Sequence, residues 1–205
     1  MTESKAEAAV LVVLDDIAGV VRDIAPGQAS LPTPCAEFDV AALQRHLLGW
    51  LDLFRVALAD PDGHERPDPA VYEGPTDPKV AAAEIDYLSD VVGVALENGV
   101  EGRAVNVPQL GGVLPGALVI SMLTAEVLGH GWDLAKATGQ PWRPDAAICE
   151  QTLAALAPVV QPEYRGEGMP FGPEIVVADD ASPLDRFIAF TGRSPEWTSD
   201  RADAE

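Results

Sequence analysis

The sequence is poor in the side chains that chemistry most often uses. It has two cysteines, Cys35 and Cys149, and three histidines, His46, His64 and His130, in 205 residues. Two isolated cysteines exclude a disulfide framework and a thiolate-rich zinc site, because both need several clustered cysteines. There is also no G-x-S-x-G, no phosphate-binding P-loop and no G-x-G-x-x-G after a strand. Any chemistry must therefore depend on a small number of side chains.

Positive charge and long apolar runs are also scarce. Only 13 Lys and Arg face 33 Asp and Glu, for a formal charge of −20. Such a surface repels phosphate backbones and anionic lipids, so we expect neither nucleic acid nor membrane as a partner. The longest apolar tract, residues 113–125, is shorter than the roughly 20 residues that span a bilayer. The apolar run 8–14 is followed at once by Asp15 and Asp16, unlike a signal peptide. We expect a cytoplasmic protein.

The remaining composition is typical of a folded protein with one sizeable core. Hydrophobic residues make up 47% and charged residues 22% of the chain. Apolar residues at helical spacing predict helices over residues 5–24, 40–59, 76–98, 115–138, 145–160 and 182–191. Since period-2 alternation is nearly absent, the predicted fold class is all-α, a helical bundle with ligands projecting inward.

Capping residues and breakers refine these boundaries. Asp39 stands at the expected N-cap of the second helix, and Gly99 and Gly139 at the ends of the third and fourth. Residues 60–75 are rich in Pro, Asp and Gly and predict a long connection between the second and third helices. Short extended pieces are expected at residues 103–107 and 174–177.

Glu126 and His130 stand out because they lie four residues apart in an apolar helical stretch. Positions i and i+4 share one face of a helix, with about 5–6 Å between Cβ atoms. A carboxylate in such surroundings carries a large desolvation cost unless it is paired or bound to a cation. The spacing therefore supports equally a Glu–His pair and two ligands of one metal ion.

His46 has a similar setting on the second predicted helix, with apolar residues three positions before it and four after it. A single interior histidine is more often a hydrogen-bonded structural residue than a ligand. Together with Glu126 and His130, it would make two imidazoles and one carboxylate, a set that leaves coordination positions of a divalent ion open. His64 lies in the long connection and is expected at the surface.

Other polar side chains have two interpretations each. Asp133 follows His130 at i+3, where it could accept the second imidazole N–H of a ligating histidine, although a solvated aspartate is the simpler interpretation. Cys35 precedes a helix, where a thiol pKa falls, although a buried packing cysteine is simpler. The cations to examine as partners of an anionic cosubstrate are Arg45, Arg103 and Arg143.

Two blocks of the sequence resemble a known family. Residues 33–40 read TPCAEFDV and are followed by Leu43 and His46, which resembles the pattern T-P-C-x-x-W-x-V-x-x-L-x-x-H with Phe38 in place of Trp. Residues 126–139 read EVLGHGWDLAKATG and resemble E-x-x-x-H-G-W-D-L-A-x-A-T-G. Both patterns are those of the mycothiol-dependent maleylpyruvate isomerase-like metal-binding proteins of the DinB-like superfamily. Residues 171–197 resemble the end of the short actinobacterial members.

The resemblance implies a DinB-like four-helix bundle with a long crossover over residues 1–160, and a short C-terminal extension over residues 161–205 that packs on the bundle. It implies one divalent metal on His46, Glu126 and His130. Zn²⁺ is the expected ion, and Ni²⁺ and Fe²⁺ also suit these ligands. It further implies mycothiol, or a similar small-molecule thiol, as a cosubstrate. A homodimer is compatible with the sequence.

Three functions fit these expectations. The first is a metal-dependent thiol S-transferase or isomerase that acts on a small electrophilic molecule, with the metal making the thiol nucleophilic. The second is a non-catalytic metal-binding or ligand-binding module. The third is a metal-dependent hydrolase that activates water. Metal content and a thiol titration of cobalt-substituted protein distinguish among them.

Overall fold

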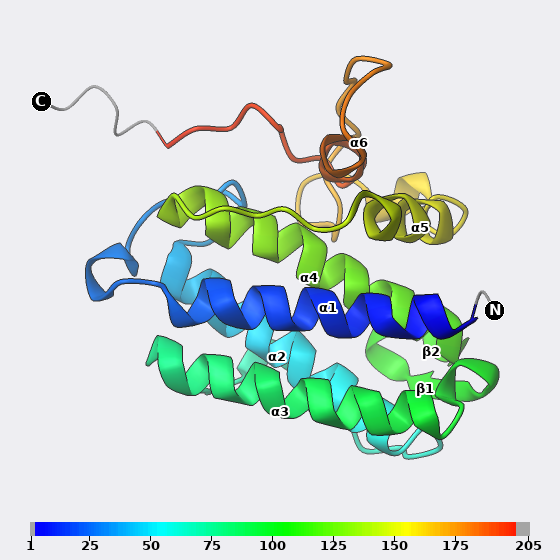
Figure 1. Cartoon of the computed structure of the whole chain (residues 1–205). Coiled ribbons are helices and arrows are strands. Elements are labelled where there is room, and N and C mark those ends of the chain that lie inside the picture. The colour runs from blue at the N-terminus through cyan, green and yellow to red at the C-terminus, as the bar shows by residue number, and fades with distance from the viewer. Residues whose placement is uncertain (1–2, 200–205) are drawn as a thin grey trace, which may run out of the picture.

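Four long helices form the body of the protein, which is a computed structural model describing residues 3–199. They are α1 (Glu3–Arg22), α2 (Val40–Ala59), α3 (Pro78–Glu97) and α4 (Gly116–Thr138), and they lie roughly side by side (Figure 1). α1 contacts α3 and α4, and α2 contacts the same two helices. Each helix thus buries its apolar stripe against two neighbours. The chain is mostly helical, as expected.

Capping chemistry sets the ends of these helices. Asp39 caps α2 as expected, accepting a hydrogen bond from the backbone N–H of Ala42. The third helix starts slightly later than expected, because Asp77 rather than Thr76 is its N-cap. α4 ends at Thr138 and is capped by Gly139, whose φ of 72° is left-handed and suits glycine.

A small antiparallel sheet departs from the all-α expectation. β1 (Ala104–Val107) pairs with β2 (Gly112–Pro115) in the segment between α3 and α4. Val105 and Val107 are fully buried, so one face of this hairpin completes the core. The extended piece expected at residues 103–107 is therefore confirmed in this hairpin, whereas residues 174–177 form no strand.

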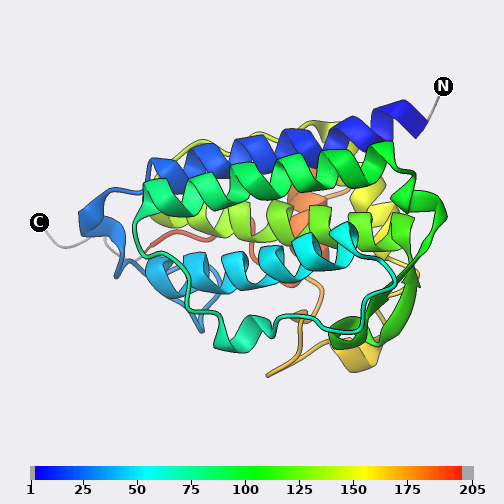
Figure 2. The same ribbon diagram turned by 90° about the horizontal axis from the view of Figure 1, so that it is seen from below.

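The long connection between α2 and α3, residues 60–77, runs back along α2 (Figure 2). Its 3-10 turn η2 (Pro69–Val71) packs on α2. Gly49 allows this approach, since a β-carbon there would lie 2.7 Å from the carbonyl oxygen of Pro69. The predicted connection is thus a packed layer on one face of α2.

Two shorter helices follow α4 in the chain. α5 (Ala146–Leu156) is shorter than predicted and packs on α4, and α6 (Pro183–Phe190) packs on α5. Figure 1 shows both on the side of α4 that faces away from α3. Within residues 3–199, no helix has the length and hydropathy needed to cross a membrane.

Candidate metal centre

Three side chains from α2 and α4 converge at one point. Oε1 of Glu126 lies 3.4 Å from Nε2 of His130 and 3.9 Å from Nε2 of His46. One candidate ligand atom of each residue lies within 4.8 Å of the other two. The two imidazole rings meet edge to face, with centroids 5.1 Å apart. The structure thus brings together the three residues that the sequence singled out.

The carboxylate of Glu126 fits a cation better than a hydrogen-bond donor. Its Oε1 atom is buried and has no hydrogen-bond partner, since the contacts to both imidazoles are long or poorly aligned. An unpartnered buried oxygen keeps its full desolvation penalty. Tetrahedral zinc with nitrogen and oxygen ligands separates its ligand atoms by roughly 3.4 Å, close to the distance between Glu126 and His130. Glu126 and His130 therefore have the spacing of two ligands of one ion, and His46 lies 3.9 Å from the same oxygen.

His130 is oriented from behind by a buried carboxylate. Its Nδ1 lies 3.1 Å from Oδ2 of Asp133, which is fully buried and also binds the guanidinium of Arg193. Burial raises the pKa of Asp133, but the charge of Arg193 and the hydrogen bond with His130 together bring it below its ordinary value. Asp133 is therefore an anionic partner of His130, and its interpretation as a solvated aspartate is wrong.

His46 is held among aromatic rings at the more open side of the centre. Its ring centroid lies 4.7 Å from that of Phe38 and 6.5 Å from that of Trp50. The hydroxyl of Thr33 bonds the carbonyl of Phe38 at 2.8 Å, so the Thr-Pro-Cys block shapes the loop that carries this ring. Burial lowers the pKa of His46, and the neutral imidazole is the form that binds metals.

The other residues that the sequence suggested for the site either lie away from the centre or differ from the chemistry expected of them. Burial raises the pKa of the Cys35 thiol, opposite to the lowering expected at a helix N-terminus. His64 is exposed, as predicted. Arg45 and Arg143 are exposed, and Arg103 pairs with Asp62 at 2.8 Å. Among the residues that the structure describes, Arg193 reaches the centre through Asp133. Local sequence patterns do not indicate it, because 60 residues separate the two.

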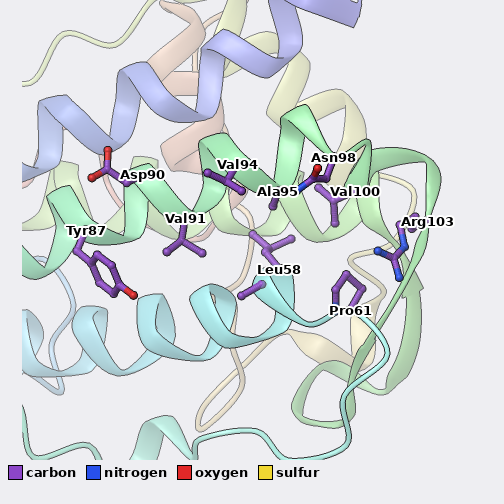
Figure 3. A pocket seen from close by; sticks show the side chains of 11 residues that line it. Leu58, Pro61, Tyr87, Asp90, Val91, Val94, Ala95, Asn98, Val100 and Arg103 are labelled. Carbon is purple, nitrogen blue, oxygen red and sulfur yellow. The ribbon is translucent and has the colours of Figure 1, made fainter.

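A cavity of about 430 Å³ lies away from this centre, between the C-terminal end of α2 and α3 (Figure 3). Leu58, Val91 and Val94 contribute apolar walls, and Arg103 stands at one end. Leu58 is roughly 18 Å along α2 from His46. At the centre itself, the side chains of His46 and Glu126 are partly exposed, with exposed fractions of 31% and 21%.

The sequence of this chain is similar to those of known proteins. A family model described as "Mycothiol maleylpyruvate isomerase N-terminal domain" matches residues 11–135. Uncharacterized protein Rv0738 of Mycobacterium tuberculosis (strain ATCC 25618 / H37Rv) is 31% identical over 181 residues, covering 88% of this chain and 93% of that protein. Uncharacterized protein MT0763 of strain CDC 1551 / Oshkosh gives the same values. No solved structure matches the chain significantly.

Proposed function

Since the chain belongs to the family of mycothiol maleylpyruvate isomerase N-terminal domains, we propose that it binds one divalent metal and uses a small-molecule thiol. The proposed ligands are His46, Glu126 and His130, with Zn²⁺ as the expected ion and Ni²⁺ or Fe²⁺ as alternatives of similar ligand preference. The observation that carries the proposal is the buried, unpartnered Oε1 of Glu126, which faces two imidazole nitrogens.

The proposal extends to the fold and its parts. The four long helices are interpreted as a DinB-like four-helix bundle, within residues 1–160, with residues 60–77 as its crossover. Residues 161–205 are interpreted as an extension that packs on the bundle. The contact of α6 with α5 and the reach of Arg193 to Asp133 support this division.

The side chains around the centre have different roles in the proposed chemistry. His46, Glu126 and His130 would hold the divalent ion, which when bound would lower the pKa of a thiol, as it does for water, and so favour a nucleophilic thiolate near neutral pH. Glu126 contributes one negative charge, and the two imidazoles contribute none. Three protein ligands leave room for a ligand from solvent. Phe38 and Trp50 give the partly exposed side an aromatic wall that suits the apolar part of a small electrophile.

The proposed activity is therefore a thiol S-transferase or isomerase reaction on a small electrophilic molecule. A low-molecular-weight thiol belongs to a reducing compartment, which agrees with the cytoplasmic location expected from the sequence. Metal content tests the first step. Protein purified without a histidine tag is expected to carry about one divalent ion per chain. Glu126→Gln, which keeps the side-chain shape but removes the charge, should lose most of it.

His64→Gln is the matched control for this measurement, because it removes a histidine that is exposed and outside the centre. It should retain the metal content of the unmodified protein. Stoichiometric metal in a His46→Ala/His130→Ala double variant would overturn the ligand assignment.

The thiol step is tested on cobalt-substituted protein. Added thiol should produce a sulfur-to-cobalt charge-transfer band, and its affinity should rise with pH because thiolate binding releases a proton. If millimolar concentrations of physiological thiols leave the cobalt spectrum unchanged, the transferase proposal is wrong. Hydrolysis of activated esters by the same protein would then support a hydrolase, and metal binding without turnover a binding module.

A further inference from the structure

The C-terminal segment reaches the candidate metal centre through one side chain, Arg193. Arg193 lies three residues after the end of α6. It directly follows Gly192, where a φ of 90° turns the chain. Gly192 packs so closely on Gly172 that a β-carbon on it would lie 2.4 Å from the Cα of Gly172. The backbone N–H of Arg193 donates to the carbonyl of Ile188 at 3.1 Å. The backbone that carries Arg193 is therefore fixed by several contacts.

The guanidinium of Arg193 is occupied by one carboxylate. Its Nε lies 3.0 Å from Oδ1 and 2.9 Å from Oδ2 of Asp133, and its Nη2 lies 2.9 Å from Oδ2. The side chain of Arg193 is 15% exposed and that of Asp133 is fully buried. Charge-assisted contacts from two nitrogens of a planar group fix the orientation of a carboxylate more firmly than a lysine does.

These contacts decide which nitrogen of His130 carries the proton. Nη2 of Arg193 lies 3.3 Å from Nδ1 of His130 but closer to Oδ2 of Asp133, and a guanidinium can only donate. A carboxylate that is ion-paired with a guanidinium can only accept, so Nδ1 of His130, which lies 3.1 Å from Oδ2 of Asp133, is the donor in that contact. Nε2 then keeps its lone pair, which agrees with the missing hydrogen bond at Glu126.

The same pair sets the charge around the centre. The positive charge of Arg193 cancels that of Asp133, so Glu126 is left as the net negative charge of the group. With a divalent ion bound, these ligands would leave one net positive charge, which one anionic ligand such as a thiolate would neutralise. Without Arg193, the uncompensated negative charge of the buried Asp133 carboxylate would repel an anionic ligand such as a thiolate at the centre.

We infer that Arg193 is a positioning residue of this centre: it orients the Asp133 carboxylate, which fixes His130 in the tautomer whose Nε2 can bind the metal. The inference rests on the proposed metal-binding function. Arg193 acts through Asp133, and the C-terminal segment thereby contributes to a site whose ligands all lie on α2 and α4.

Two measurements test this role. The tautomer of His130 is read from imidazole ¹⁵N chemical shifts in metal-free protein, and the zinc dissociation constant from competition with a chromophoric chelator. Arg193→Met should weaken zinc binding about 10- to 100-fold, the usual effect of losing an outer-shell partner, and should give a mixture of tautomers. Arg193→Lys should fall between this variant and the unmodified protein, because it keeps the charge but not the planar group.

A double variant separates positioning from folding. Arg193→Met/Asp133→Leu leaves no uncompensated buried charge and should therefore fold, yet it should show the same 10- to 100-fold loss of zinc affinity. Arg186→Met is the matched control, since this arginine of α6 pairs with the exposed Glu150 at 3.1 Å. It should keep the zinc affinity of the unmodified protein.

The outcomes are distinct. The inference would be overturned if the double variant bound zinc as tightly as the unmodified protein and still had His130 protonated at Nδ1. Failure of the unmodified protein to bind any metal would instead overturn the proposed function. In that case the ¹⁵N shifts of Arg193→Met still decide whether Arg193 controls the His130 tautomer.

Discussion

The indole of Trp142 lies directly against the Cα of Gly131. A β-carbon on Gly131 would lie 2.4 Å from Cζ2 of Trp142 and 2.9 Å from Cδ1 of Ile17. Trp142 follows the end of α4 and folds back over it, while Ile17 belongs to α1. The glycine after His130 therefore lets two elements approach α4 beside the candidate metal centre.

Gly131→Ala is expected to destabilise the protein by about 1–3 kcal/mol, since the indole and Ile17 must move to admit the methyl group. The change in the free energy of unfolding is measured by urea denaturation. Gly129→Ala is the matched control on the same helix, because its β-carbon would lie 3.6 Å from the nearest atom, in Arg193. It should be neutral or stabilising, by up to about 1 kcal/mol of helix propensity. Equal effects of both changes would contradict the packing argument.

Metal-free protein should lose stability as the pH falls below about 6.5. Burial lowers the pKa of His46 in the folded state, so the unfolded chain takes up the proton first, near the ordinary histidine pKa of about 6.5. The free energy of unfolding then decreases with falling pH until the folded-state pKa is reached. His46→Gln should flatten this part of the pH profile in urea titrations. If the free energy of unfolding of His46→Gln fell with pH as steeply as that of the unmodified protein, His46 would not be the group responsible.

Removal of the metal should lower the melting temperature without abolishing the cooperative transition. The buried core is large enough to fold alone. Free zinc at 100 times its dissociation constant adds about 2.7 kcal/mol of stability, or about 5–10 °C for a chain of this size. Calorimetry with and without chelator measures this difference, which should vanish in Glu126→Gln. A chain that unfolds outright on chelation would show that the core alone is insufficient.

Both cysteines should react slowly with iodoacetamide at pH 7.5. Burial raises the pKa of Cys149 to about 11 and also raises that of Cys35, so little thiolate is present. Mass spectrometry should show slow alkylation in native protein and fast alkylation in urea. Cys35→Ser should keep its metal. Rapid native alkylation of Cys35 with loss of metal would instead make this thiol a candidate ligand.

The elements that local physics dictates were predictable from the sequence. Apolar residues at helical spacing, and caps such as Asp39 and Gly139, gave the four long helices to within a few residues. The pairing of Glu126 with His130 followed from the i, i+4 geometry of one helix. The convergence of His46 on this pair, in contrast, depends on how α2 packs against α4. The sequence suggested it through the apolar setting of His46 and the ligand chemistry of two imidazoles and one carboxylate, and the family resemblance implied the same set.

The role of Arg193 was not predictable for a related reason. Its partner Asp133 lies 60 residues away, and the intervening chain passes through α5, α6 and a turn at Gly192 whose closeness to Gly172 no periodicity encodes. The hairpin of residues 104–115 was visible only in part. Its strands are short, so their pairing depends on burial of Val105 and Val107 against the helices rather than on local preference.

The contact between Asp133 and Arg193 also bears on where this protein can be divided. The segment that matches the family model ends at residue 135, so it includes the carboxylate but excludes the arginine. A fragment cut at that boundary, or at residue 160, would retain an aspartate buried completely in the whole chain without its cationic partner. The segment that the family model covers is thus smaller than the unit in which these two charges balance, because that unit extends to Arg193.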